Sequence, residues 1–290
     1  MPKLAVVTDS TTSIPERIIN DLKINIVPYY IHRGNEVLRD LVTIDRETFY
    51  KWLPTATQLP TTASPGPGDY VQTYQKLAEE QHVEEIVSIH MTSKGSGAYQ
   101  AAMNAKSTIA EILPRLKVEV IDTLNASMCH GWMAIEAARA VLANCSLAEV
   151  VNKVRQMMPV TRMIHTADTL KYLYMGGRIG KAKHLVGSLL NIKPLIGMED
   201  GVIVPLGTAR NRNQAYRSIV EMVEKAAGET GKIKIAYVHA AALEEAQKIK
   251  ELIEQRLHVI EWTFAELSPA LGVHTGPGTA GVCYFPVLDK

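Results

Sequence analysis

Cysteine is scarce in this 290-residue chain, and its three thiols follow no metal or disulfide pattern. An odd count without a Cys-x-x-Cys pair argues against a disulfide framework and against a zinc site of the usual spacing. Buried free thiols in a reducing compartment are therefore expected at Cys129, Cys145 and Cys283. Excess charge is also missing: the net charge is +1, so no strong field would attract nucleic acid or an anionic membrane.

Long apolar runs are missing as well. No stretch approaches the roughly 20 apolar residues of a membrane-spanning helix, so stable membrane insertion is not expected. The apolar run Leu4–Val7 near the N-terminus is far too short for the core of a signal peptide. We therefore expect a cytoplasmic protein.

The common nucleotide and hydrolase motifs are absent. The chain contains neither Gly-x-x-x-x-Gly-Lys-Ser/Thr nor Gly-x-Ser-x-Gly. The first predicted strand, Leu4–Thr8, is followed by Asp9-Ser10-Thr11 rather than by the glycine pattern of a dinucleotide site. No group of His, Asp and Glu has metal-ligand spacing. The sequence thus predicts no metal and no nucleotide cofactor.

What the chain does contain is an alternation of short apolar segments with helix-like segments. Buried strands that alternate with helices favour a parallel sheet flanked by helices. The predicted strands of this first part are Leu4–Thr8, Ile24–Ile31, Glu85–His90 and Val118–Asp122. Hydrophobic residues make up 47% of the chain, which leaves apolar side chains to line a ligand cavity as well as a core.

The pattern changes near residue 165. Glu199-Asp200-Gly201 separates two apolar segments and predicts a β-hairpin. We therefore predict an α/β protein of two lobes. Residues 1–165 would form a parallel α/β domain, and residues 166–290 an α+β domain with a mixed or antiparallel sheet.

Hydroxyl-rich loops follow several predicted strands. They are Asp9–Ser13, Thr61–Ser64, Thr92–Gly97 and Asp122–Ser127. Because the carboxyl ends of parallel strands meet at one edge, we expect most of these loops to lie together. Hydroxyls and helix N-termini donate hydrogen bonds to a carboxylate or a phosphate, and the spacing does not separate the two. Each loop taken alone is equally explained as a helix cap.

Two later segments add candidate donors. His274 opens the turn His274–Gly278, where glycines permit close backbone approach and the ring could donate to an anion. Arg178 lies in the glycine-rich segment Gly176–Gly180 and could clamp an anion or dock a partner. A structural histidine and a solvated turn are the plain alternatives.

Together these segments resemble the DegV family of bacterial fatty-acid-binding proteins. The matching segments are Val7–Thr11, Pro60–Thr62 with Pro65, Ser93 with Ser96–Gln100, Val120–Thr123, Leu173–Ile179, Leu190–Pro194 and His274–Gly278. Each segment is short, but seven in the same order along nearly the whole chain make a chance match improbable.

The resemblance implies a lipid carrier rather than an enzyme. A long-chain fatty acid such as palmitate, stearate or oleate would be buried in the first lobe, with the second lobe closing over its head group. A separate fatty-acid kinase would phosphorylate it, and the chain would carry the acyl-phosphate for phospholipid synthesis without a cofactor.

The resemblance also implies a set of site residues. Thr62 and Ser93 would bind the carboxylate. The residues expected around that head group are Thr62, Ser93, Ser96, Gly97, His274 and Arg178, with Asp9, Ser10 and Thr11 in the first-strand loop.

The chain departs from the family pattern in its outer donors. It has Ala63-Ser64-Pro65 where Ser-Gln-Pro is usual, and Thr92 replaces the first residue of a Ser-Ser pair. Ala98 replaces a threonine. Two potential head-group donors are therefore missing, while Thr62, Ser93 and His274 remain.

Two other functions fit the same residues. A stand-alone phosphotransferase or hydrolase would use Ser93 or Ser96 as nucleophile and His274 as base, although no acidic residue at motif spacing would orient the histidine. A binding module for another small anion, such as a phosphorylated sugar, would use the same hydroxyl loops.

Overall fold

The structure, a computed structural model, describes residues 3–188, 192–228 and 231–287. Leu190 and Asn191, from one of the family-like segments, lie outside these ranges. Where the chain is described, it forms the predicted α/β fold with one parallel and one mixed sheet.

The first sheet is parallel throughout, in the order β2-β1-β6-β7. Its strands are β1 (Leu4–Asp9), β2 (Asn25–Val27), β6 (Glu85–His90) and β7 (Lys117–Asp122). Every residue of β6 is buried, because helices cover both faces of a parallel sheet. The apolar runs at these positions therefore predicted the sheet correctly.

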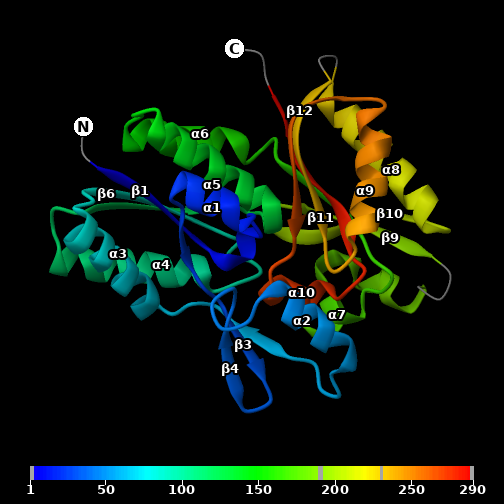
Figure 1. Cartoon of the computed structure of the whole chain (residues 1–290), viewed down its shortest axis with the longest axis horizontal. Coiled ribbons are helices and arrows are strands. Elements are labelled where there is room, and N and C mark those ends of the chain that lie inside the picture. The colour runs from blue at the N-terminus through cyan, green and yellow to red at the C-terminus, as the bar shows by residue number, and fades with distance from the viewer. Residues whose placement is uncertain (1–2, 189–191, 229–230, 288–290) are drawn as a thin grey trace.

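Helices cover both faces of this sheet (Figure 1). The helices on one face are α3 (Pro67–Gln81) and α4 (Ala98–Ile112), and those on the other are α1 (Glu16–Leu22), α5 (Ser127–Leu142) and α6 (Leu147–Met157). Helix α5 is buried on nearly all sides because its far side packs against the second sheet. Its Trp132 donates a hydrogen bond from Nε1 to the carbonyl of Cys283, 3.1 Å away in that sheet.

The second sheet has the order β10-β9-β8-β13-β11-β12. Its strands are β8 (Arg162–Thr166), β9 (Lys193–Glu199), β10 (Val202–Ala209), β11 (Lys232–His239), β12 (His258–Glu266) and β13 (Ala280–Pro286). All neighbours are antiparallel except β11 and β12, which pair in parallel. The outer face is covered by α8 (Arg212–Ala227) and α9 (Leu243–Glu254). Strand β8, which belongs to this second sheet, spans residue 165. The division of the chain into two domains at that residue stays a prediction.

A third, antiparallel sheet was not predicted. Its order is β4-β3-β5, with β3 (Tyr30–Arg33), β4 (Glu36–Arg39) and β5 (Thr61–Ala63). The predicted strand 24–31 is interrupted at Pro28, which lacks an N–H for the ladder, so the run divides between β2 and β3. The β3–β4 hairpin projects from the lower edge of the molecule in Figure 1.

Short helices complete the chain near that edge. They are α2 (Arg46–Trp52), α7 (Lys171–Met175), α10 (Pro269–Thr275) and the 3₁₀ segments Ser10–Thr12, Leu53–Thr55 and Gly180–Ser188. His274 therefore lies in the last turn of α10, and the tight turn expected at 274–278 begins only after Thr275.

Candidate functional site

The loops that follow three parallel strands meet at one edge of the first sheet, as expected. β1 leads into Ser10–Thr12, β6 into residues 91–97 and β7 into residues 123–126. Residues of these loops, of the second sheet and of α10 together enclose a cavity of about 370 Å³. That volume lies in the range of small-molecule sites, roughly 300–1,000 Å³.

The two lobes contribute different chemistry to this cavity. Its hydroxyl groups come mainly from the first lobe, with Thr11, Thr62, Ser64, Thr92, Ser96 and Ser127 in the lining beside Gly97. Its apolar wall comes mainly from the second lobe, through Leu173, Ile196, Met198, Ile203 and Leu271. The expectation that the first lobe would surround the acyl chain stays a prediction.

Thr62 on β5 and His274 on α10 form the polar end of the cavity. Thr62 Oγ1 lies 2.8 Å from His274 Nε2, whereas His274 Nδ1 is buried without a hydrogen-bond partner. A buried ring nitrogen without a partner is better tolerated as an acceptor than as an N–H donor, so we assign the proton to Nε2. His274 then donates to Thr62, and the Thr62 hydroxyl hydrogen is free to bind a ligand.

The histidine ring carries no charge at neutral pH. Burial, together with the positive charge of Arg178, lowers the pKa of His274 to about 4. The ring fits only because position 176 is glycine: a Cβ at Gly176 would lie 2.3 Å from His274 Nδ1. Thr62 and His274 therefore present neutral polar groups at this end of the cavity.

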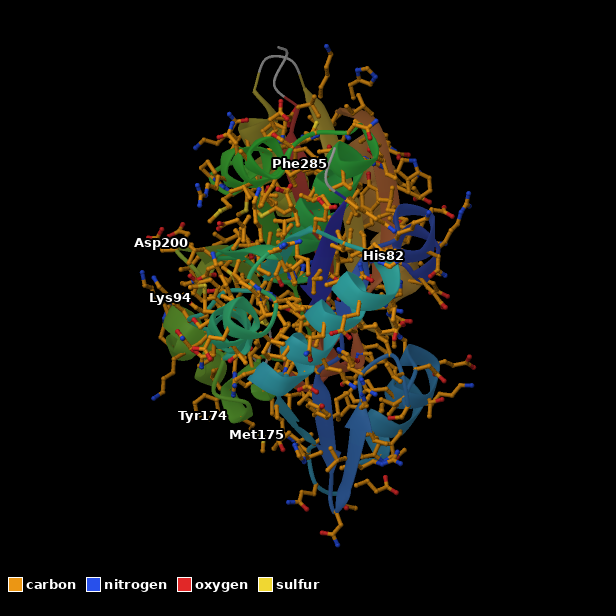
Figure 2. All side chains as sticks on the ribbon, turned by 90° about the vertical axis from the view of Figure 1, so that its left-hand side faces the viewer. His82, Lys94, Tyr174, Met175, Asp200 and Phe285 are labelled. Atoms are coloured by element: carbon orange, nitrogen blue, oxygen red, sulfur yellow. The ribbon has the colours of Figure 1, made fainter. Side chains whose placement is uncertain are left out.

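Arg178 brings a cation to the mouth of this cavity. It lines the cavity while remaining exposed, and its Nη1 donates to the carbonyl of Gly176 at 2.7 Å. Its Nε lies 3.5 Å from the carbonyl of Gly95, so the side chain links the glycine-rich segment to the loop after β6. Tyr174 and Met175 are 48% and 59% exposed and lie at the lower left of Figure 2.

The loop after β6 presents Ser96, rather than Ser93, to the cavity. Ser96 is in the lining, and its Oγ lies 2.5 Å from the hydroxyl of Tyr29. Ser93 is exposed and is not among the lining residues. A turn closed by the Gly95 N–H and the Thr92 carbonyl, 3.1 Å apart, contains Ser93 at the surface. Sequence spacing does not reveal this turn, and it did not indicate Tyr29.

Within the first-strand loop, Thr11 lines the cavity, and the carboxylate of Asp9 holds Thr11 in place through hydrogen bonds. The Asp9 carboxylate accepts hydrogen bonds from the amides of Thr11 and Met91, at 3.0 and 3.3 Å. It also pairs with the Thr11 hydroxyl and with His90 Nδ1, the latter at 3.2 Å. Asp9 is fully buried and does not line the cavity.

The pKa of Asp9 is low although the carboxyl is buried. Burial by itself raises it, but the imidazoles of His130 and His90 and the hydroxyl of Thr11 lower the pKa of Asp9 to about 2. Asp9 is therefore ionised at neutral pH and orients Thr11.

Ser10 also points inward, where it meets a second buried acid. Its Oγ donates to Asp40 at 2.6 Å. Asp40 directly follows β4 and accepts a second hydrogen bond, at 3.3 Å, from the amide of Ala270 in the first turn of α10. The Asp40 carboxyl thus ties the first-strand loop to the helix that carries His274.

Asp40 should make the stability of the fold depend on pH. Burial raises the pKa of Asp40 to about 6, against opposing hydrogen bonds from Ser10 and Ala270, from an ordinary value of 3.8. Between these two values the folded chain binds more protons than the unfolded chain, so this group's contribution to stability falls as pH rises. We expect Asp40→Asn, which cannot ionise, to make the Tm depend less on pH between 3.8 and about 6. An unchanged pH profile of the Tm would contradict this assignment.

Among the described residues, the hydrogen bonds of His274 do not pair it with a serine. His274 Nε2 bonds to Thr62 rather than to Ser93 or Ser96. Within the described ranges, His274 Nδ1 has no carboxylate to orient the ring as a catalytic base requires. The same part of the chain contains no group of three or more His, Cys, Asp and Glu residues that could hold a metal ion.

No helix among the described residues is both long and apolar enough to cross a bilayer.

The two sheets and the cavity between them define a two-lobed α/β protein. The family model described as "Uncharacterised protein, DegV family" matches residues 3–287. The chain belongs to the DegV family.

Relatives and solved structures match this chain over nearly its whole length. A DegV domain-containing protein of Halalkalibacterium halodurans is 31% identical over 287 residues, which cover 98% of this chain and 99% of the relative. A structure reported for fatty acid binding of a DegV family protein from Thermus thermophilus has a TM-score of 0.90 at 28% identity, covering 98% of this chain and 100% of that one. A stearic-acid-binding protein from Eubacterium ventriosum has a TM-score of 0.89 at 26% identity, covering 99% and 98%.

Proposed function

We propose that this protein binds one long-chain fatty acid, such as palmitate, stearate or oleate. The carboxylate would accept hydrogen bonds from Thr62 and Ser96 near Arg178, and the tail would lie against the apolar wall. The observation that carries this proposal is the cavity itself, in which an apolar wall from one lobe faces hydroxyl donors from the other.

The energetics of such a ligand suit this cavity. Each buried methylene contributes roughly 0.8 kcal/mol, so about a dozen would contribute on the order of 10 kcal/mol before the costs of association. The tail therefore supplies most of the affinity. The head group needs enough donors to remain satisfied, since an unpaired buried carboxylate would take up a proton or leave.

The position of the head group suggests how the ligand is used. The carboxylate would lie at the mouth beside Arg178 and Lys94, both exposed residues of the lining. We propose that a separate fatty-acid kinase phosphorylates it there and that this protein carries the acyl-phosphate to phospholipid synthesis in the cytoplasm. The two cations would stabilise the added phosphate charge. The protein itself would act as a carrier and not as an enzyme.

The direct test is to identify what the purified protein contains. Native mass spectrometry and organic extraction should find one fatty acid per chain. Delipidated protein should take up palmitate or oleate, and protein alone should not consume ATP with fatty acid. A chain that purifies empty and takes up neither lipid would overturn the proposal, and turnover without a partner would favour the hydrolase or phosphotransferase.

Arg178→Ala should separate lipid binding from lipid use. Because Arg178 is exposed and the apolar wall supplies most of the affinity, we expect fatty acid retention to stay close to that of the native protein. Phosphorylation of the bound lipid by a fatty-acid kinase should fall by about tenfold or more, because a charge-assisted contact with the phosphate or the partner is lost.

Arg17→Ala is the matched control for this variant. Arg17 lies on α1, and its side chain is 92% exposed. This control should change neither retention nor turnover. If Arg178→Ala empties the cavity instead, Arg178 holds the lipid and the docking role is wrong.

A further inference from the structure

A second hollow adjoins the cavity. It is a groove of about 970 Å³ between the loop after β7, the end of α6 and the β9–β10 turn. Met198 lines both the cavity and this groove. Among the described residues, Met198 is the one that the linings of the cavity and the groove have in common.

The rest of the partition is fixed. The hydroxyl of Thr92 donates to the carbonyl of Gly201 at 3.0 Å, which holds the β9–β10 turn against the loop after β6. A Cβ at Gly201 would lie 2.3 Å from Thr92 Oγ1 and 3.3 Å from Leu124 Cδ2, so the backbone of Gly201 packs closely against these two side chains. Figure 2 shows Lys94 and Asp200, from the same two loops, at one edge of the molecule.

Met198 is the part that can move. Its side chain is half-buried and packs against the edge of the main hydrophobic core. An unbranched thioether changes rotamer easily and adapts to irregular neighbours. A change of its rotamer would join the two hollows without moving the backbone.

The length of the acyl chain gives a reason to join them. The Eubacterium ventriosum relative binds stearic acid, whose chain has eighteen carbons. The groove offers apolar lining beyond Met198, from Val120, Leu124 and Met158.

We propose that Met198 is the residue that determines acyl-chain length, and that the distal end of a long chain passes it into the groove. This inference rests on the proposed fatty acid function and adds where the chain ends. The outer part of the groove is bordered by charged residues, among them Asp122, Arg155 and Glu199. Because a methyl end gains nothing beside charges, the chain would stop before this rim.

The test compares affinities for saturated fatty acids of twelve to twenty-two carbons by competition against a fluorescent lipid. Met198→Ala should favour longer chains, by about fourfold for each added methylene that enters the groove. Met198→Trp should close the passage and favour the shortest acids of the series. The ratio of affinities within one variant does not depend on how much of the protein is folded.

Met163→Ala is the matched control, because Met163 lines the cavity but not the groove. This variant enlarges the cavity by the same Met-to-Ala change. Its preference for long chains should increase less than that of Met198→Ala. Equal changes in chain-length preference in the two alanine variants would overturn the proposed role of Met198. An unchanged chain-length preference in Met198→Ala would overturn it as well. If the native protein binds no fatty acid at all, the proposed function fails, and not merely the proposed role of Met198.

Discussion

Asp9→Ala should destabilise the protein by about 3–5 kcal/mol, the cost of removing one partner from a buried charged network. The substitution leaves the amides of Thr11 and Met91 without their acceptor. It also leaves His90 Nδ1 with the hydroxyl of Tyr70, 3.4 Å away, in place of the carboxylate. Each buried donor that loses its partner costs its full desolvation. Urea unfolding at neutral pH should show a lower midpoint.

The pH dependence of this effect has a definite sign. The pKa of Asp9 is lowered from 3.8 to about 2, so its contribution is fully present above pH 3.8 and is lost as pH falls towards about 2. The difference in stability between Asp9→Ala and the native protein should therefore shrink in strong acid.

Asp45→Ala is the control for this variant. Asp45 is an exposed aspartate that caps α2 by accepting a hydrogen bond from the Thr48 amide at 2.7 Å. Loss of such a cap costs only about 1 kcal/mol. Equal losses in the two variants would show that the network around Asp9 contributes no more than an ordinary cap.

Thr62→Val should weaken fatty acid binding by roughly tenfold to a hundredfold, as expected for a lost hydrogen bond to a charged group worth about 1.5–3 kcal/mol. Valine keeps the shape of threonine but removes the hydroxyl that would donate to the carboxylate. It also leaves His274 Nε2, 2.8 Å from that hydroxyl, without its acceptor. Calorimetric titration with palmitate measures the change.

Thr61→Val tests whether the effect belongs to the site. Thr61 is the neighbouring residue on β5, is exposed and does not line the cavity, since adjacent side chains of a strand point to opposite faces. Its affinity for palmitate should match that of the native protein. If Thr62→Val binds as tightly as Thr61→Val, the carboxylate lies elsewhere in the cavity.

The sequence predicted those parts of the fold that local patterns determine. Apolar runs at Leu4–Thr8, Glu85–His90 and Val118–Asp122 became strands of the parallel sheet, and Glu199-Asp200-Gly201 became a hairpin turn. These predictions and the family assignment are confirmed. The antiparallel sheet was missed because β5 has only three residues and lies in a proline-rich segment.

The site was harder to predict, because it depends on contacts between distant residues. Thr62 and His274 are 212 positions apart and lie within hydrogen-bonding distance, and the family resemblance alone brought them together. The direction of a loop side chain depends on a local turn and not on spacing, and for that reason Ser93 and Ser96 could not be distinguished. The roles of the carboxylate-binding residues stay predictions.

Helix α5 packs between the two sheets, and its residues share one apolar cluster with strands of both. Each lobe therefore completes its interior with the other. A fragment ending near residue 165 would leave the far side of α5 uncovered by the second sheet, and a fragment beginning there would expose the inner face of that sheet to water. We expect neither piece to be soluble when expressed alone, so the two lobes should unfold as a single cooperative unit.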